Sequence, residues 1–190
     1  ARAMTLLDEL SFWAPEARKM QFSAPTPMFY EQAAWGTSTR RDRLQALTAL
    51  ACYHLAGVEK PALPPVIFTS IRALMARTLP RRDFIKASKF LKTGQTGQPE
   101  TFQRGWLDIG YSTVDIVLEP GQVSRRGGIL DIWPMAEEWP FRIEFFGDEI
   151  DEMRRFDPAS QRTLGKIGQV LITPAREILP GMADRLEAVI

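Results

Sequence analysis

The sequence predicts an α/β segment that carries a smaller, inserted α+β module, and the apolar pattern leads to this fold class. Short apolar strands alternate with helices up to about residue 78. Pro80 marks a boundary, after which two predicted helices are followed by stretches in which apolar residues recur at every second position. The last predicted strand is expected to return to the sheet of the first segment.

The first segment is expected to alternate helices and strands. In chain order we expect a helix over 3–10, a strand over 19–23, a helix over 39–56, a strand over 65–69 and a helix that Ser70 caps. The helix over 39–56 has the clearest signal, because its apolar residues recur at spacings of three and four and Gly57 follows as a stop. The helix after Ser70 carries Ile71, Leu74 and Met75 on one face.

The inserted module is expected to begin with helices and to continue as a meander of strands. We expect helices over 81–91 and 99–109 with a polar turn over 93–98, then four strands over 122–126, 129–133, 141–146 and 150–156. The strand that returns to the sheet of the first segment is expected over 169–173. An amphipathic helix is expected to end the chain.

The composition predicts a globular, cytoplasmic protein that makes no contact with a membrane. The 190 residues are 45% hydrophobic, 25% charged and 10% aromatic, and the net charge of +1 provides no global attraction for nucleic acid. The longest apolar stretch, 46–58, is too short to span a bilayer. Cys52 and His54 are single residues of their kinds, which excludes an internal disulfide and a Cys/His zinc cluster. The start, which lacks an initiator methionine, indicates a fragment of a longer protein.

The sequence contains no convincing catalytic motif. Gly94 and Gly97 lack the spacing and the Gly-Lys-Ser/Thr ending of a phosphate-binding P-loop. The stretch 148–151 spells the DExD pattern of helicases, but that role requires a P-loop, so a turn between strands is the better interpretation. The carboxylates near Glu137 and Glu144 have no evident general-base partner. We therefore expect no enzyme activity, no cofactor and no metal site.

Charge is distributed unevenly along the chain. Seven basic residues and one acid fall within 72–92, whereas eight acids and one base fall within 131–152. Two solvated surfaces explain this pattern most simply. Single-strand binding, with phosphates on the 72–92 cluster and bases stacked on Trp133, Trp139 or Phe146, is a second hypothesis. It is disfavoured because these aromatic residues lie in the acidic half.

The strand over 141–146 carries the most informative pattern. Alternation assigns to the core face Phe141, Ile143 and Phe145. It assigns to the opposite face, which is expected to face solvent, Arg142, Glu144 and Phe146. An exposed aromatic residue flanked by charge is typical of a protein-binding anchor. The alternative is an amphipathic strand whose Phe146 is covered by a neighbouring loop. In the preceding strand Arg125 and Arg126 face opposite ways, so only one of them can join Arg142.

Three blocks, 120–134, 141–150 and 155–158, together resemble the module that the bacterial repair protein UvrB shares with the transcription-repair coupling factors (Mfd). Smaller pieces at 29–31, 161–163 and 174–177 are similar to the coupling factors in particular. No P-loop is visible, nor is the aromatic-rich hairpin with which UvrB clamps DNA. The resemblance therefore favours the coupling factors, with a fragment of UvrB, or of a related ATP-dependent DNA helicase with nucleotide or DNA binding, as the alternative.

This resemblance implies both a fold and a function. It implies a degenerate RecA-like domain made of 1–78 and the return segment 163–190, with a UvrA-binding domain at 79–162 that packs two helices on a short-stranded antiparallel sheet. It implies recruitment of UvrA by mimicry of UvrB. The family's recognition residues fall on Arg126, Arg142 and Phe146, with weaker candidates at Glu144 and Arg125. Ser124 stands where UvrB-type sequences carry another arginine. The parent protein is expected to be an ATP-dependent DNA translocase that also binds RNA polymerase and double-stranded DNA through parts outside this chain.

Overall fold

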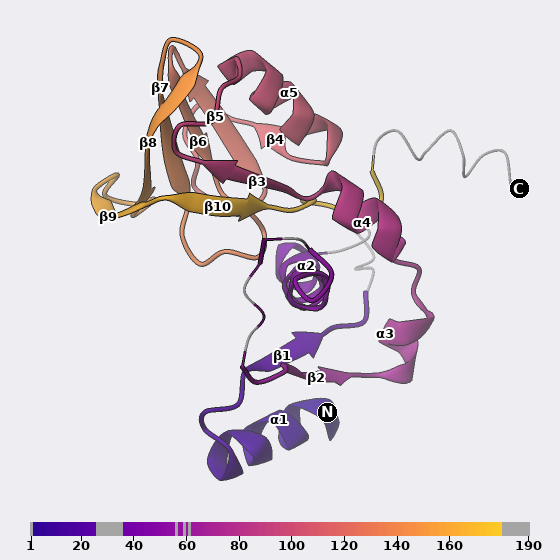
Figure 1. The fold of residues 1–190 in the computed structure, drawn as a ribbon. Helices are drawn as coiled ribbons and strands as arrows, with labels where there is room; N and C mark the ends of the chain where they lie inside the picture. Colours follow the sequence, from indigo (N-terminus) through magenta and orange to yellow (C-terminus); the bar gives the residue numbers. More distant parts are fainter. Residues whose placement is uncertain (1, 26–35, 56, 59, 61, 180–190) are drawn as a thin grey trace, which may run out of the picture. The chain divides into compact units, whose positions relative to one another are not determined.

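The chain divides into two compact units, residues 1–78 and 79–190. The structure, a computed structural model, describes residues 2–25, 36–55, 57–58, 60 and 62–179. Figure 1 labels the helices and strands of both units. The mixture of helices and sheets expected from the sequence is confirmed. None of the helices within the described ranges is long and apolar enough to cross a membrane.

The first unit is built around two parallel strands joined through a helix. Its described elements are α1 (Arg2–Trp13), β1 (Lys19–Phe22), α2 (Thr37–Ala51), β2 (Val66–Thr69) and α3 (Ile71–Met75). Met20 of β1 lies opposite Ile67 of β2 in a parallel register. Parallel strands need a long crossover connection, and α2 lies within it. The expected α/β arrangement is therefore present in this unit.

The core of the first unit holds a buried charge. Arg43 of α2 is fully buried, and its guanidinium lies over the ring of Phe22 at 3.9 Å from the centroid. Its Nη1 donates hydrogen bonds to the carbonyl oxygens of Ser23 at 3.1 Å and Ala73 at 3.3 Å. These acceptors compensate for the loss of water around the charge. Arg43 thereby connects α2 to α3 and to the residue that follows β1.

Ser70 caps α3 as the sequence predicts. Its Oγ accepts a hydrogen bond from the Ala73 backbone N–H at 3.2 Å. The side chain that α3 buries is Ala73, whereas the apolar face of Ile71, Leu74 and Met75 is exposed. The pieces of sequence at 29–31 and in the terminal helix, which entered the expectations above, lie outside the described residues.

The second unit holds one larger sheet and one strand pair. Its described elements are α4 (Arg81–Ala87), β3 (Lys89–Lys92), α5 (Pro99–Asp108), β4 (Ser112–Thr113), β5 (Gln122–Arg126), β6 (Ile129–Ile132), β7 (Phe141–Phe146), β8 (Glu149–Phe156), β9 (Thr163–Ile167) and β10 (Gln169–Ile172). The larger sheet has the strand order β4-β5-β6-β7-β8-β9, and β3 pairs with β10. All neighbours in the larger sheet are antiparallel except β4 and β5.

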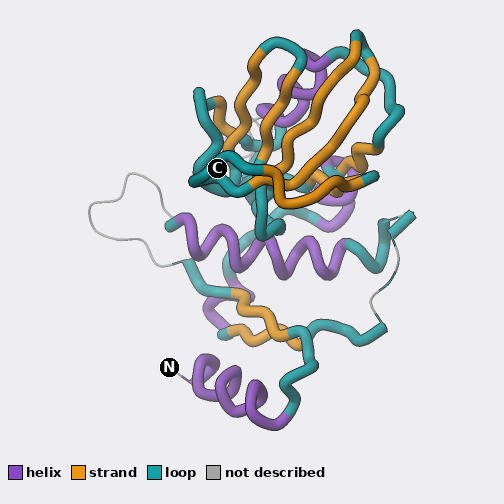
Figure 2. The backbone as a smooth tube through the Cα atoms, turned by 90° about the vertical axis from the view of Figure 1, so that its left-hand side faces the viewer, coloured by secondary structure: helices purple, strands orange, loops and turns teal. Residues whose placement is uncertain are grey.

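Helix α5 covers one face of the larger sheet, as Figures 1 and 2 show. The ring of Phe102 on α5 lies 5.7 Å from the ring of Phe145 on β7, and Trp106 one turn further on is buried. We call this side of the sheet the inner face and the opposite side the outer face. The fully buried side chains of the sheet strands include Val123, Leu130, Ile132, Phe141, Ile143, Ile150 and Met153.

Two expected elements of this unit were wrong. The helix expected over 81–91 ends at Ala87, because Ser88 adopts an extended conformation and the next four residues form β3. The strand expected to rejoin the first segment pairs with β3 instead, with Val170 opposite Leu91. Residues 163–167, which were expected to belong to the return segment, form β9 at the edge of the larger sheet. For β3 and β10, pairing with residues distant in sequence outweighs local preference.

Candidate protein-binding surface

The outer face of the larger sheet brings together the charged residues singled out in the sequence. Asp131 of β6 lies directly opposite Ser124 of β5 and Arg142 of β7. Residues directly opposite each other in antiparallel strands present their side chains on the same face. Because side chains alternate along each strand, Arg126 and Glu144 lie on this face as well.

Asp131 connects two of the candidate arginines. Its carboxylate is only 3% exposed. It accepts hydrogen bonds from Arg142 Nε at 2.7 Å and Arg142 Nη2 at 2.8 Å, and from Arg126 Nη2 at 3.0 Å. The fork-shaped contact with Arg142 is the strong, bidentate type. Two guanidinium groups and one carboxylate leave this cluster with a charge of +1.

Asp131 was not among the residues predicted from the sequence. It interrupts an otherwise apolar strand, Ile-Leu-Asp-Ile, at a position flanked by buried residues. A buried acid requires a partner that compensates its charge. That interruption was the signal that could have identified it.

Arg142 was expected to face solvent, and this expectation was wrong. Its side chain is 16% exposed. Its guanidinium lies over the Phe156 ring at 4.6 Å from the centroid, and its Nη2 donates to Gln161 Oε1 at 2.9 Å. The hydrogen bond to Asp131 raises the pKa of Arg142, although burial opposes this shift. Contacts with Asp131, Phe156 and Gln161 therefore fix the position of the Arg142 guanidinium.

Gln161, which contacts Arg142, adopts an unusual backbone conformation. Its φ of 60° lies in the left-handed region, which is uncommon for residues other than glycine. Its backbone N–H donates to the Asp157 carbonyl at 2.7 Å, and its Nε2 donates to the Pro158 carbonyl at 2.8 Å. This turn directs the amide oxygen of Gln161 toward Arg142.

Arg126 is the more accessible of the two arginines. Its side chain is 53% exposed, and only Nη2 makes a hydrogen bond within the part of the chain that the structure describes. Arg125 points to the inner face, where it pairs with Glu100 of α5. The prediction that only one of these adjacent arginines joins Arg142 is therefore confirmed, and that residue is Arg126.

Phe146 is the most exposed of the candidate residues. It ends β7, and its side chain is 84% exposed. The following turn to β8 contains Gly147, whose φ of 61° suits glycine. Residues 94–97 bind the turn and the start of β8, because Gly97 N–H donates to the Asp148 carbonyl at 2.7 Å and Ile150 N–H donates to the Gln95 carbonyl at 2.9 Å. Phe146 therefore lies next to a hairpin turn that backbone hydrogen bonds from residues 94–97 hold in place.

Glu144 is already paired with a neighbouring cation. It contacts Arg154 of β8, which also contacts Glu152, and Glu152 in turn pairs with Lys166 of β9. Ser124 is buried, and its hydroxyl donates to the Asp115 carbonyl at 2.8 Å. Neither residue therefore presents a free contact comparable to that of Arg126.

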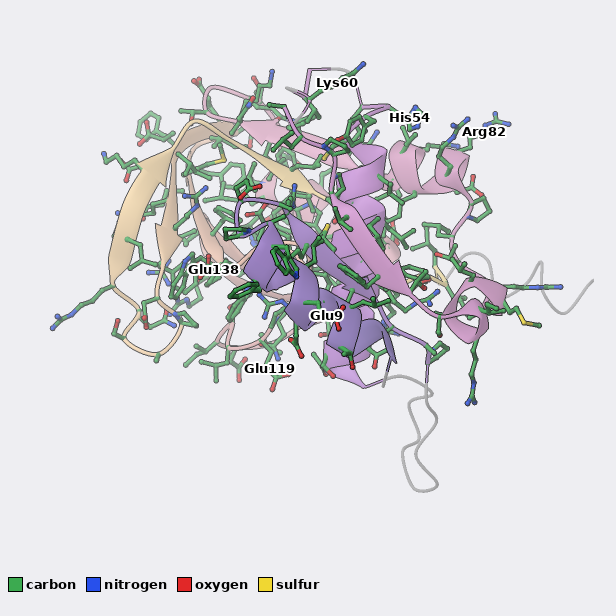
Figure 3. All side chains as sticks on the ribbon, turned by 90° about the horizontal axis from the view of Figure 1, so that it is seen from below. Glu9, His54, Lys60, Arg82, Glu119 and Glu138 are labelled. Atoms are coloured by element: carbon green, nitrogen blue, oxygen red, sulfur yellow. The ribbon has the colours of Figure 1, made fainter. Side chains whose placement is uncertain are left out.

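The motifs that resemble catalytic sites lie in structural turns. Asp148 belongs to the turn between antiparallel strands, and Gly94 belongs to the loop that braces that turn. His54 follows α2 in a turn and is exposed, as Figure 3 shows. Among the described residues, no group of three acidic, histidine or cysteine side chains is arranged to hold a metal ion.

Comparison with known proteins finds a family that is similar to the second unit. Residues 90–178 match the family model of the UvrB interaction domain. All five candidate residues and Asp131 lie within the matched range.

Comparison with individual proteins extends the similarity over most of the chain. The transcription-repair-coupling factor of Myxococcus xanthus is 32% identical over 163 residues, which cover 85% of this chain and 13% of that protein. The transcription-repair-coupling factor of Escherichia coli is 37% identical over 112 residues, which cover 59% of this chain and 10% of that protein. The UvrABC system protein B of Gloeothece citriformis is 34% identical over 123 residues, or 65% of this chain and 18% of that protein. The resemblance to the coupling factors is confirmed, and the aligned parts span between 10 and 18% of these relatives.

Proposed function

We propose that this chain is a protein-interaction module that recruits UvrA during transcription-coupled nucleotide excision repair, by presenting the surface that UvrB also presents. One observation carries the proposal. The exposed Phe146 lies on the same sheet as the exposed Arg126, whose guanidinium is oriented by buried Asp131. The similarity to both coupling factors and UvrABC system protein B supports the choice of partner.

The proposed contacts follow from the chemistry of these side chains. The guanidinium nitrogens of Arg126 that do not bind Asp131 are suited to a carboxylate on UvrA, because arginine forms charge-assisted hydrogen bonds with carboxylates. Phe146 would enter an apolar pocket beside that carboxylate. Arg142 adds positive charge and keeps Asp131 in position, rather than acting as a freely exposed contact.

The organisation of the chain is also a proposal. We assign residues 1–78 to the first part of a degenerate RecA-like domain, which the parallel pair of β1 and β2 with α2 in its crossover supports. We propose that the UvrA-binding domain begins near Leu79 and continues beyond residue 162, which the pairing of β9 with β8 and of β10 with β3 supports. We place the parent protein in the cytoplasm as an ATP-dependent DNA translocase that binds RNA polymerase and double-stranded DNA through other domains.

Arg126 and Arg125 provide a matched test of this surface, since they are adjacent and point to opposite faces. Arg126→Ala is expected to weaken binding to purified UvrA by about 1 kcal/mol, or roughly fivefold in Kd, because the charge-assisted contact is lost. Arg125→Ala is expected to leave the Kd unchanged. Isothermal titration calorimetry measures both. Equal losses in the two variants would show that general charge, rather than the outer face, determines binding.

A second candidate function is that of a UvrB or helicase fragment that binds nucleotide or DNA, and the similarity to UvrABC system protein B favours it. We expect no magnesium-dependent ATP turnover by the purified chain, because the sequence contains no P-loop and Asp148 lies in a hairpin turn. A phosphate-release assay with the chain and its Asp148→Ala variant tests this. Turnover that the substitution abolishes would support the helicase alternative.

A further inference from the structure

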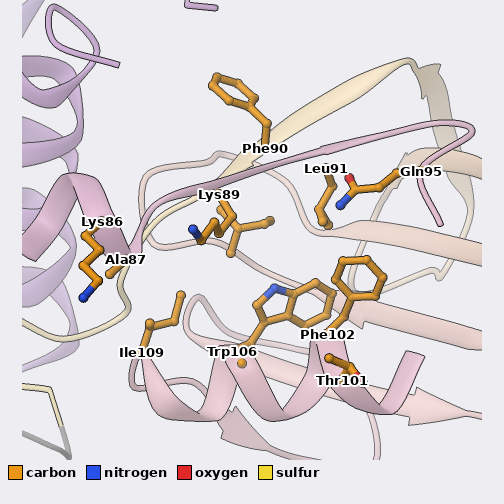
Figure 4. A pocket seen from close by; sticks show the side chains of 12 residues that line it. Lys86, Ala87, Lys89, Phe90, Leu91, Gln95, Thr101, Phe102, Trp106 and Ile109 are labelled. Carbon is orange, nitrogen blue, oxygen red and sulfur yellow. The ribbon is translucent and has the colours of Figure 1, made fainter. Parts of the chain in front are cut away.

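The second unit contains a pocket on the side of the larger sheet that α5 covers. This pocket is separate from the outer face. It lies between α5, α4 and the β3–β10 pair, and it has a volume of about 410 Å³. Figure 4 shows its lining side chains. The apolar lining includes Leu91, Phe102, Trp106, Ile109 and Ile172. This volume lies within the range of pockets that hold organic ligands.

One hydrogen-bond donor of the pocket, the indole N–H of Trp106, has no partner among the described residues. Trp106 is only 4% exposed, and its indole N–H makes no hydrogen bond to any part of the chain that the structure describes. In Figure 4 the indole nitrogen faces the side of the pocket that carries Lys89. The nitrogen atom itself is not among the buried polar atoms without a partner, so an acceptor on a ligand in the pocket can reach it.

The other polar groups around the pocket also favour an acceptor-rich ligand. Lys86 of α4 and Lys89 of β3 are exposed and make no ion pair with any described residue. The Oε1 of Gln95 already accepts a hydrogen bond from the Lys92 backbone N–H at 3.2 Å, which leaves the amide N–H groups of Gln95 as donors. No acidic side chain lines the pocket among the residues that the structure describes. The lining therefore combines an apolar floor with positively charged donors.

We propose that this pocket is a docking site for a short acidic peptide segment of a partner protein. A large apolar side chain of the peptide occupies the floor beside Phe102 and Trp106. Carboxylates next to that side chain pair with Lys86 and Lys89, and a peptide oxygen accepts from the Trp106 N–H. Charge complementarity between these carboxylates and the two lysines selects this occupant.

This site does not depend on the proposed recruitment of UvrA. It lies on the side of the sheet that α5 covers, whereas Phe146 and Arg126 lie at the outer face. The proposed site also gives a role to Lys86 and Lys89, which belong to the basic cluster at 72–92 and have no role in the proposed binding of UvrA. Stacking of nucleic-acid bases on Trp106 is disfavoured, because only 4% of this residue is exposed.

The test uses defined peptides and the 190-residue chain. The probe is the acetylated peptide Glu-Asp-Leu-Phe-Glu-Asp, and its controls are Lys-Lys-Leu-Phe-Lys-Lys and Glu-Asp-Ser-Ser-Glu-Asp. We expect the acidic, apolar probe to shift the indole N–H resonance of Trp106 saturably in ¹H–¹⁵N NMR spectra, and both controls to leave it unchanged. The Trp106→Phe variant assigns that resonance among the five tryptophans.

Charge reversal localises the binding. The double variant Lys86→Glu/Lys89→Glu is expected to weaken the probe about tenfold or more, because both lysines are exposed and line the pocket. Lys92→Glu is the matched control, since Lys92 lies on the same strand but does not line the pocket. The double variant should retain the remaining amide spectrum, which shows that it folds.

Several results would overturn this proposal. It fails if the folded chain gives no saturable shift of the Trp106 resonance, or if the serine-containing control binds as tightly as the probe. It also fails if Lys92→Glu weakens the probe as much as the double variant does. Binding of oligothymidylate in place of the peptide, with the same dependence on Lys86 and Lys89, would identify a nucleic-acid site instead.

Discussion

Replacing Asp131 with alanine is expected to lower the free energy of unfolding of the second unit by about 3 kcal/mol. The substitution leaves Arg142 largely covered beside Phe156 without its carboxylate, and Arg126 loses its partner as well. The loss lies at the lower end of the range for breaking a buried pair, because Arg142 retains some contact with water and its bond to Gln161.

Denaturant unfolding followed by tryptophan fluorescence measures this effect. Asp151 provides the matched control, because it is an exposed acid on β8 of the same sheet, and Asp151→Ala should change the free energy of unfolding by less than about 0.5 kcal/mol. Asp131→Asn preserves the shape and one acceptor oxygen, so its loss should be smaller than that of Asp131→Ala. Equal stabilities of Asp131→Ala and Asp151→Ala would show that the cluster around Asp131 does not organise the outer face.

Replacing Phe146 with alanine is expected to weaken binding to UvrA by about 2 kcal/mol, or roughly 30-fold in Kd, with almost no change in stability. The side chain is exposed in the free chain, so its removal leaves no cavity. Its proposed burial in a pocket of UvrA would make it the centre of the interface, where aromatic residues contribute most.

Calorimetric titration of UvrA, combined with thermal unfolding of each variant, separates these two effects. Leu107→Ala is the control, because Leu107 is an exposed apolar residue on α5, which covers the opposite face of the sheet. Its Kd should equal that of the unmodified chain. If Phe146→Ala binds with full affinity, or if it unfolds the domain, the assignment of Phe146 as an exposed anchor is wrong.

Alternation along β7 was sufficient to predict its two faces near the centre of the sheet. Phe141 and Ile143 are buried, and Phe146 is exposed, as the period of two requires. An antiparallel sheet that buries one face specifies this pattern strongly, because a slip of one residue would expose the whole apolar set. The exposure of Phe146 could therefore be predicted from local sequence.

Local sequence did not predict the environment of Arg142 or Phe145. Arg142 is covered because the register of β6 places Asp131 directly opposite it, and that register depends on long-range pairing. Phe145 was predicted to lie in the core, but it is only half-buried, because a bulge shifts the register of β7 and β8 after Glu144. Truncation of Phe145 should therefore cost less than removal of a fully buried phenylalanine.

The strand pair of β3 and β10 shows the same limit at the level of the fold. Residues 89–92, with the sequence Lys-Phe-Leu-Lys, are compatible with a helix, and the preceding residues do form one. They become a strand because β10, almost eighty residues later, supplies hydrogen bonds and covers Leu91. A single sequence carries no local signal for this pairing.

Competition between this chain and UvrB for UvrA tests the central claim most directly. Fluorescently labelled UvrB bound to purified UvrA is titrated with the unlabelled chain, and the anisotropy of the label reports release. If the outer face mimics UvrB, the chain displaces UvrB completely, and the Phe146→Ala variant requires about 30 times the concentration to do so. Retention of UvrB on UvrA at saturating concentrations of the folded chain would contradict the proposed recruitment.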